Sequence, residues 1–213
     1  YFCNMNILLT GATGFLGFRT LERLVQLSNV KKIVATGRVL RKSREILNPK
    51  VEYILGDLKD KIFVSAILKD IDIVVNTASL SSPWGSEDDF YLANVLTQKN
   101  IISSAEILGV KRFIYISSPS IYYNGKDRIM VKEKDSLPTR FVNNYSKTKR
   151  EAELLLEYSK LDYIIIRPRA IIGRGDTVIM PRLIKVNSEG RLKIIGNGKN
   201  RVDLTSVDNV VES

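Results

Sequence analysis

Tyr145 and Lys149 are the residues of this chain whose types and spacing best suit proton transfer. They stand four residues apart in a stretch with helical periodicity, so both side chains should lie on one face of a helix. A free tyrosine has a pKa of about 10, which is too high for a general base at neutral pH. A neighbouring ammonium group favours the phenolate, so we expect Lys149 to lower the pKa of Tyr145. The spacing alone also fits a solvated helix pair.

A second set of residues suits phosphate binding. Three glycines stand between an expected strand and an expected helix, in the sequence Gly11-Ala12-Thr13-Gly14-Phe15-Leu16-Gly17. Glycine permits a tight turn and a close approach of pyrophosphate to the backbone, and a helix N-terminus presents free N–H groups to negative charge. The hydroxyl of Thr13 could add a donor. The spacing differs from the commoner Gly-x-Gly-x-x-Gly, but its place between strand and helix predicts a dinucleotide-binding turn.

Apolar runs alternate with helical patterns, and this alternation must position both sets. The expected strands are short and almost continuously apolar, which is typical of parallel strands buried on both faces: residues 6–10, 32–36, 51–55, 71–75, 112–116 and 163–166. The expected helices cover residues 16–27, 62–68, 90–108 and 144–159. The order predicts an α/β fold, a Rossmann doubly wound parallel sheet with helices on both faces.

The pattern loosens after Pro168, where glycines become frequent. We expect residues 1–168 to form a dinucleotide-binding domain and residues 169–213 to begin a smaller C-terminal substrate lobe. Because residues 207–209 have the pattern of a beginning helix, we expect the natural protein to continue beyond Ser213. The longest irregular stretch, residues 118–143, predicts a functional loop beside the sheet.

Composition excludes several kinds of chemistry. The 213 residues include no histidine and one cysteine, Cys3, so a Ser-His-Asp triad and a disulfide framework are excluded, and we expect no metal site. The single cysteine favours a reducing compartment, and we expect a cytoplasmic protein. Residues 1–6 lack the pattern of a signal peptide, and no apolar run is long enough for a membrane span. The formal net charge of +10 is spread along the chain, which predicts no nucleic-acid partner and leaves an anionic ligand open.

The glycine turn and the sequence Tyr145-Ser146-Lys147-Thr148-Lys149 together resemble the extended short-chain dehydrogenase/reductase family. That family contains NAD-dependent epimerases and dehydratases and enzymes like 3β-hydroxysteroid dehydrogenase, and residues 118–122 and 143–145 are most similar to the steroid branch. Other segments agree: Gly56-Asp57-Leu58 with the adenine-contacting turn, Asn76-Thr77-Ala78-Ser79 with the cofactor-lining segment, and Arg167-Pro168-Arg169 with the turn near the nicotinamide.

The resemblance implies a role for each matching residue. Ser118 would hydrogen-bond the substrate oxygen and Tyr145 would pass the proton. Tyr145 and Lys149 would also contact the cofactor, with Lys149 on the nicotinamide ribose. Asn94 matches an asparagine that faces the active site, although it could equally be a polar face residue. The remaining cofactor-binding residues implied are Gly11, Thr13, Gly14, Phe15, Leu16, Gly17, Arg38, Asp57, Leu58, Thr77, Ala78, Ser79 and Pro168.

Tyr122 and the loop that contains Trp84 are less determined. A second Tyr-x-x-x-Lys pattern begins at Tyr122, but Asn124-Gly125 predicts a turn there and we assign it no catalytic role. Trp84, in a loop with Ser81 and Ser82, could pack against a flat substrate or anchor the loop.

The choice of cofactor depends on the residues after the second strand. An acidic residue there usually holds the ribose 2′-hydroxyl, but this chain has Gly37 followed by Arg38, with Arg41 and Lys42 nearby. Arginine can pair with a 2′-phosphate, so we favour NADP(H) and keep NAD(H) open. Alternatively, Arg38 stacks on the adenine or faces water.

Three functions remain open. The first is an oxidoreductase that transfers hydride between the nicotinamide and a secondary alcohol or ketone, with a sterol-like or sugar-like small molecule as substrate. The second is a nucleotide-sugar epimerase or dehydratase that retains NAD. The third is a non-catalytic dinucleotide-binding sensor. By resemblance, a homodimer formed through two long helices is also expected.

Overall fold

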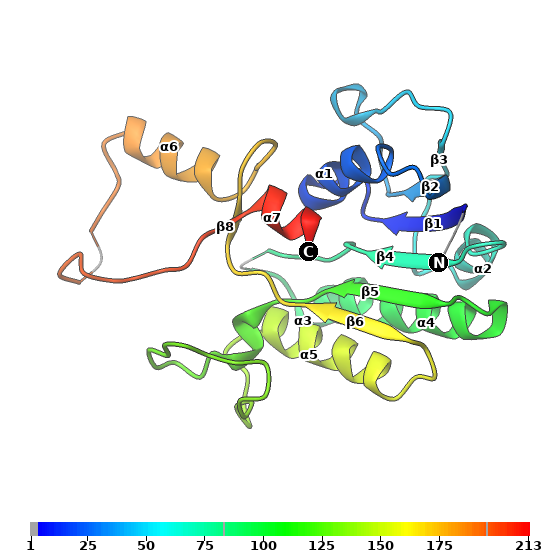
Figure 1. Cartoon of the computed structure of the whole chain (residues 1–213). Helices are drawn as coiled ribbons and strands as arrows, with labels where there is room; N and C mark the ends of the chain where they lie inside the picture. The colour runs from blue at the N-terminus through cyan, green and yellow to red at the C-terminus, as the bar shows by residue number, and fades with distance from the viewer. Residues whose placement is uncertain (1–3, 83, 195) are drawn as a thin grey trace.

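The computed structural model describes residues 4–82, 84–194 and 196–213, so Cys3 lies outside the described residues. Six parallel strands form one sheet in the order β3-β2-β1-β4-β5-β6 (Figure 1). Their bounds are β1 Met5–Thr10, β2 Val30–Thr36, β3 Val51–Tyr53, β4 Ile73–Asn76, β5 Arg112–Ile116 and β6 Tyr163–Ile166. Two short strands, β7 (Ile171–Ile172) and β8 (Thr205–Ser206), form a separate parallel pair.

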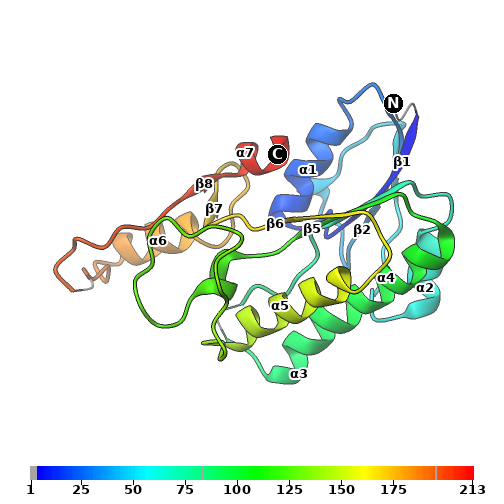
Figure 2. The same cartoon turned by 60° about the horizontal axis from the view of Figure 1, so that its bottom comes forward.

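Helices cover both faces of the sheet. Figure 2 shows α2, α4 and α5 on one face and α1 and α7 on the other. The bounds are α1 Phe15–Leu24, α2 Lys61–Ile67, α3 Glu87–Phe90, α4 Thr97–Leu108, α5 Asn144–Glu157, α6 Met180–Ser188 and α7 Val207–Glu212. A π-helical stretch, η2 (Tyr91–Leu96), joins α3 to α4, and the 3-10 turns are η1 (Lys42–Arg44) and η3 (Pro119–Tyr122).

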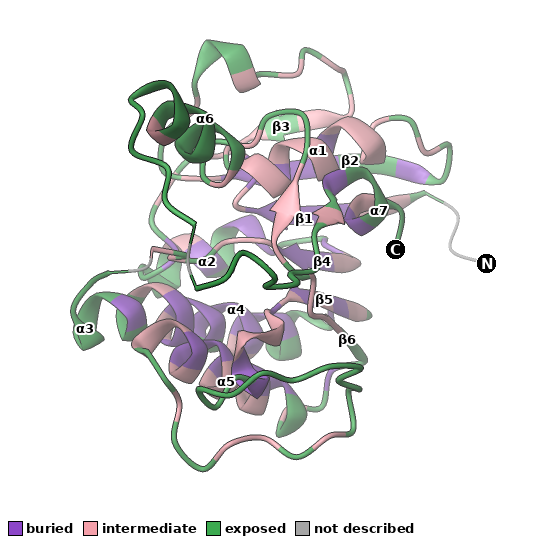
Figure 3. Cartoon of the chain, turned by 90° about the vertical axis from the view of Figure 1, so that its left-hand side faces the viewer, coloured by how far each residue is buried: buried purple, intermediate pink, exposed green. Residues whose placement is uncertain are grey.

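The core consists of two apolar layers, because neighbouring strand residues point to opposite faces. Leu8 of β1 and Phe113 of β5 belong to the layer under α2, α4 and α5, whereas Ile7 and Leu9 of β1 belong to the layer under α1. This explains why the strands read as continuous apolar runs: both faces are buried. Burial of α4 and α5 and exposure of α6 are visible in Figure 3.

The doubly wound fold expected from the sequence is confirmed, and β5 and β6 have the predicted bounds. The helix expected over residues 90–108 begins earlier, at Glu87, where Ser86 accepts a hydrogen bond from the Asp89 N–H at 3.1 Å. It also contains the unexpected π-helical stretch. β7, β8 and α6 were not expected from the sequence. The two strands are too short to show an alternating pattern, and α6 packs no residue into the core. No helix in the described ranges is long and apolar enough to cross a membrane.

Candidate active site

The glycine turn lies where the sheet order reverses. Because β1 pairs with both β2 and β4, the carboxyl ends of β1 and β4 border the crevice in which doubly wound sheets bind their ligands. Gly11 has a φ of +68°, and a Cβ atom there would lie 2.7 Å from Thr77 Oγ1. A Cβ atom at Gly17 would overlap the carbonyl oxygen of Gly11. The turn therefore requires glycine both for backbone conformation and for the close contact between β1, α1 and β4.

The first turn of α1 is suited to an anion. Its N-cap, Gly14, has no side chain to bond the first N–H groups, and the turn contains no acidic residue. Unpaired N–H groups at a helix N-terminus favour phosphate. Phe15 and Leu16 open the helix, and the Phe15 ring approaches Gly175, where an added Cβ atom would lie 3.6 Å from it. The bare turn and free amides fit the diphosphate of a dinucleotide.

A buried string of side chains supports this crevice. The Thr10 hydroxyl donates to Asn76 Oδ1 at 2.5 Å, and the Asn76 amide donates to Gln98 Oε1 at 2.5 Å. Asn76 Oδ1 also accepts from the Ala78 N–H at 3.1 Å, while Thr77 Oγ1 donates to the Thr10 carbonyl at 2.7 Å. The cofactor-lining segment predicted after β4 is thus fixed to β1. Ser79 is exposed at the outer end of that segment.

The expected adenine-contacting turn follows β3 and lies near the end of β2. The Gly56 N–H donates to the Gly37 carbonyl at 3.1 Å. The positive charge of Arg38 contributes to a lowered pKa of Asp57, although the Lys59 N–H has the largest effect. Leu58 is buried in the core, and its carbonyl accepts from the Asn100 amide at 3.1 Å. The structure therefore places Arg38 near Asp57, whereas Leu58 packs into the core.

Arg44 is a cation in this region that the sequence reasoning did not single out. Its guanidinium donates to the Thr13 carbonyl at 3.2 Å and to the Gly175 carbonyl at 3.2 Å. It therefore links the glycine turn to the segment after β7. The basic run after Arg38 contained this signal, but the run alone did not show which cation folds back on the turn.

Ser118, Tyr145 and Lys149 come from neighbouring elements at the carboxyl ends of β5 and β6. Ser118 follows β5, and Tyr145 begins α5, whose N-cap Asn143 accepts from the Ser146 N–H at 2.8 Å. Burial raises the pKa of Tyr145, and a hydrogen bond with Ser118 lowers it by less. The expectation that the pKa of Tyr145 is lowered is wrong for the chain without ligand, because desolvation of the ring outweighs its polar contacts.

Lys149 is buried at 1% exposure, and its Nζ donates to the Ile116 carbonyl at 2.6 Å. The ammonium lies over the Tyr115 ring, 4.3 Å from the ring centroid. Burial lowers the pKa of Lys149 to about 7, against an opposing effect of Glu153. The pKa of Lys149 therefore lies near neutral pH, well below the ordinary lysine value.

Asn94 lies in the π-helical stretch and joins three elements. Its Oδ1 accepts from the Leu80 N–H at 2.7 Å, and its amide donates to the Leu80 carbonyl at 3.2 Å and to Thr148 Oγ1 at 3.1 Å. A π-turn inside a helix is frequent at functional sites. These contacts hold the loop after β4 beside α5, next to the turn that carries Tyr145.

Several other side chains complete the picture. Trp84 is 82% exposed, so its ring does not anchor its loop in a packed position. The hydroxyl oxygens of Ser117 and Ser120, on either side of Ser118, are buried with no hydrogen-bond partner among the described residues. Pro168 lines a hollow of about 340 Å³ beside α7. No group of three or more His, Cys, Asp or Glu residues in the described part could hold a metal ion.

Comparisons with known proteins agree with this geometry. The profile of the "NAD dependent epimerase/dehydratase family" matches residues 7–213. The chain is 32% identical to a 2-alkyl-3-oxoalkanoate reductase of Stenotrophomonas maltophilia over 96% of the chain and 62% of that protein. It is 33% identical to isoform 1 of a 3beta-hydroxysteroid-dehydrogenase/decarboxylase of Arabidopsis thaliana over 96% of the chain and 50% of that protein. The chain thus spans less than two thirds of either relative.

Solved structures show the same architecture. The UDP-glucuronic acid 4-epimerase of Bacillus cereus, in complex with UDP-glucuronic acid and NAD, superposes with a TM-score of 0.83 at 26% identity. The match covers 97% of this chain and 71% of that one.

Proposed function

The chain belongs to the NAD-dependent epimerase/dehydratase family, and on that premise we propose that it is an NAD(P)-dependent oxidoreductase of a secondary alcohol or the matching ketone. The observation that carries the proposal is the placement of Ser118, Tyr145 and Lys149 at the carboxyl edge of the sheet, which also carries the glycine turn. The complete set speaks against a sensor without turnover.

Each residue has a proposed task. The backbone of the glycine turn and Thr13 hold the diphosphate, with Thr77 and Ala78 closing the opposite wall, and Lys149 holds the nicotinamide ribose. Nicotinamide, when bound, gives or accepts hydride. The Ser118 hydroxyl hydrogen-bonds the substrate oxygen, and Tyr145 donates its hydroxyl proton to that oxygen in reduction or, as the phenolate, takes up the alcohol proton in oxidation. Asn94 acts as a positioning residue through Leu80 and Thr148.

The test measures absorbance at 340 nm with NADPH or NADH and a panel that includes a 2-alkyl-3-oxo acid, a 3-ketosteroid and a nucleotide sugar. We expect turnover of a ketone and a loss of at least about 100-fold in kcat for Tyr145→Phe, since positioned acid–base groups contribute 10²–10⁴-fold. Lys147→Ala on the same helix serves as control. Tightly retained NAD, identified by mass after purification, with epimerisation and no net change at 340 nm would favour the epimerase alternative, which the superposition with the epimerase structure keeps open.

For the cofactor, we propose NADP(H). Arg38 and Arg44 supply cations beside the expected adenosine ribose, and Gly37 replaces the acidic residue that would repel a 2′-phosphate. Each charge-assisted bond to phosphate contributes about 1.5–3 kcal/mol, equivalent to about 10- to 100-fold in affinity. Arg38→Ala should therefore weaken NADPH binding by that factor and leave NADH binding nearly unchanged. Lys31→Ala, at the amino end of β2, the strand that precedes Arg38, should change the affinity for neither dinucleotide.

Two coarser proposals concern assembly. Residues 1–168 would bind the dinucleotide, and residues 169–213 would begin the substrate-binding region. A second copy of the chain would pair through α4 and α5, where a hollow of about 370 Å³ is lined by Tyr91, Val95 and Leu154 among others. Sedimentation velocity tests the pairing, and Leu154→Glu should shift a dimer to monomer.

A further inference from the structure

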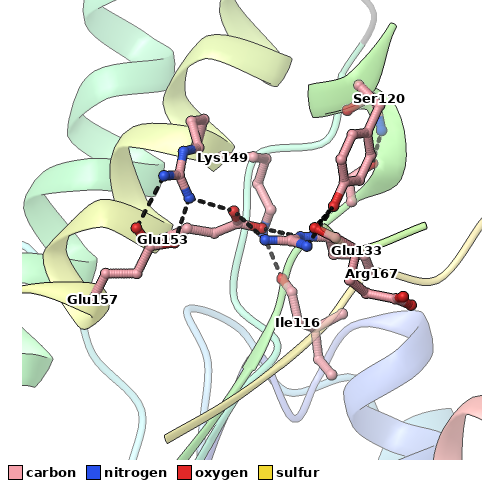
Figure 4. A network of polar contacts seen from close by, with 10 residues as sticks. Ile116, Ser120, Glu133, Lys149, Glu153, Glu157 and Arg167 are labelled. Atoms are coloured by element: carbon pink, nitrogen blue, oxygen red, sulfur yellow. Dashed lines mark hydrogen bonds and ion pairs between the residues drawn. The ribbon is translucent and has the colours of Figure 1, made fainter. Parts of the chain in front are cut away.

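The carboxylate of Glu153 is entirely buried one helical turn after Lys149. Two guanidinium groups hold it. Arg167 forms a fork, with Nε on Oε1 at 2.8 Å and Nη2 on Oε2 at 2.9 Å, and Arg150 Nη1 reaches Oε2 at 3.1 Å (Figure 4). Because both oxygens are fixed in this way, the negative charge has one position in the fold.

Stability alone does not explain this buried pair. The cost of removing two charges from water about equals their attraction, so a buried ion pair contributes little net stability compared with apolar residues of the same size. The pair also belongs to a longer chain of contacts, since Arg167 Nη1 donates to the Tyr122 hydroxyl at 2.6 Å and that hydroxyl donates to the Glu133 carbonyl at 2.9 Å. The sequence assigned Tyr122 no catalytic role. In the structure its hydroxyl connects Arg167, and through Arg167 the helix α5, to the loop that precedes α5.

Lys149 faces few charged or titratable groups. Tyr115 approaches it from β5, and Tyr145 and Glu153 lie one turn before and after it on α5. Arg150 and Arg167 bind the Glu153 carboxylate, so their positive charges lie next to it. Its direct hydrogen bond goes to the neutral carbonyl of Ile116, so Glu153 is the carboxylate whose charge favours the ammonium form against burial.

We propose that Glu153 is a positioning residue for the reaction: its buried carboxylate, fixed by Arg167 one helical turn from Lys149, favours the ammonium form of that lysine against the cost of burial. Because Arg167 binds both carboxylate oxygens of Glu153, the direct hydrogen bond of Lys149 Nζ goes to the Ile116 carbonyl and not to Glu153. Glu153 touches neither substrate nor cofactor and acts through Lys149. The inference rests on the proposed function, in which Lys149 binds the nicotinamide ribose.

The test compares Glu153→Gln with Glu157→Gln. The second variant removes a carboxylate from the same network, because Glu157 binds Arg150 at 2.5 and 2.9 Å, but it lies a further turn from Lys149. The dissociation constant of NADPH, from its fluorescence, and kcat/KM with a carbonyl substrate are measured from pH 6 to pH 9. An opposite charge within a few ångströms shifts a pKa by about 1–3 units, so Glu153→Gln should move the alkaline limb of both profiles down by about one pH unit. Glu157→Gln should leave the limb in place.

A folded Glu153→Gln protein whose alkaline limb coincides with that of the wild type overturns the inference, even if its melting temperature falls. If this variant does not fold, Glu153→Asp decides: the retracted carboxylate should move the limb in the same direction by a smaller amount, and an unmoved limb overturns the inference. Failure of the proposed function looks different. In that case the wild-type chain binds neither dinucleotide, and both proposals fall together.

Discussion

Replacing Lys149 with methionine should make the stability of this chain less dependent on pH. The lysine is 1% exposed, and burial lowers its pKa from 10.5 to about 7. Between these two values the unfolded chain holds a proton on Lys149 that the folded chain has released. Stability rises with pH wherever the unfolded state binds more protons, so the folded wild type should become more stable as the pH rises from 7 towards 10.5.

The size of the effect follows from the two pKa values. One pKa unit corresponds to about 1.4 kcal/mol, which is the largest slope per pH unit that one group can give. Since the folded-state group is about half titrated at pH 7, the wild type should gain about 2 kcal/mol in free energy of unfolding between pH 7 and pH 9. Methionine fills a similar volume and does not titrate. The gain should therefore be absent in Lys149→Met.

The assay is urea denaturation of the cofactor-free chain at pH 6, 7, 8 and 9, followed by circular dichroism. Lys147→Met is the matched control, because the pKa of Lys147 is raised by Glu87 and its titration lies outside this range. Tyr115 and Tyr145, whose pKa values burial raises, also titrate above the range. Parallel stability curves for wild type and Lys149→Met from pH 7 to pH 9 would refute the argument that burial keeps Lys149 neutral.

Three further outcomes follow from the described contacts. Gly17→Ala should abolish NADPH binding in a fluorescence titration, because the new methyl group would overlap the Gly11 carbonyl oxygen. Asn76→Ala should lower the free energy of unfolding in urea by about 2–3 kcal/mol, since it leaves buried polar groups on both sides without partners. Tyr122→Phe removes the hydroxyl between Arg167 and the Glu133 carbonyl, and limited proteolysis should then cleave residues 123–142 faster than in wild type, with little change in the melting temperature.

The fold could be predicted from local patterns because the core strands are buried on both faces. Each strand between residues 5 and 116 leaves an apolar run, and helical segments separate these runs except between β2 and β3, so the crossover rule then leaves few topologies. The region after Pro168 could not be predicted in the same way. Its helix α6 buries no residue, and β7 and β8 pair across more than thirty residues through two residues each. Nothing in the local sequence records such a long-range pairing.

The same distinction between local and long-range features applies to the candidate site. The glycine turn and the Tyr145–Lys149 pair depend on spacing within one element, so sequence showed them. The string from Thr10 through Asn76 to Gln98 joins β1, β4 and α4, and only the folded sheet brings these residues together. Glu153 is an intermediate case. Its spacing of four from Lys149 can be read from the sequence. Its burial and its two hydrogen bonds with Arg167, the residue that follows β6, depend on the fold.

Lys149 has two proposed roles, binding of the nicotinamide ribose and support of proton transfer by Tyr145. Its burial bears on both. A buried cation without a counter-charge lowers the stability of the folded chain, and the fork of Arg167 on Glu153 keeps the nearest carboxylate from pairing with it directly. The ammonium is therefore incompletely compensated within the protein. A dinucleotide bound at the glycine turn would add negative charge to this crevice, and its binding would then favour the protonated form of Lys149.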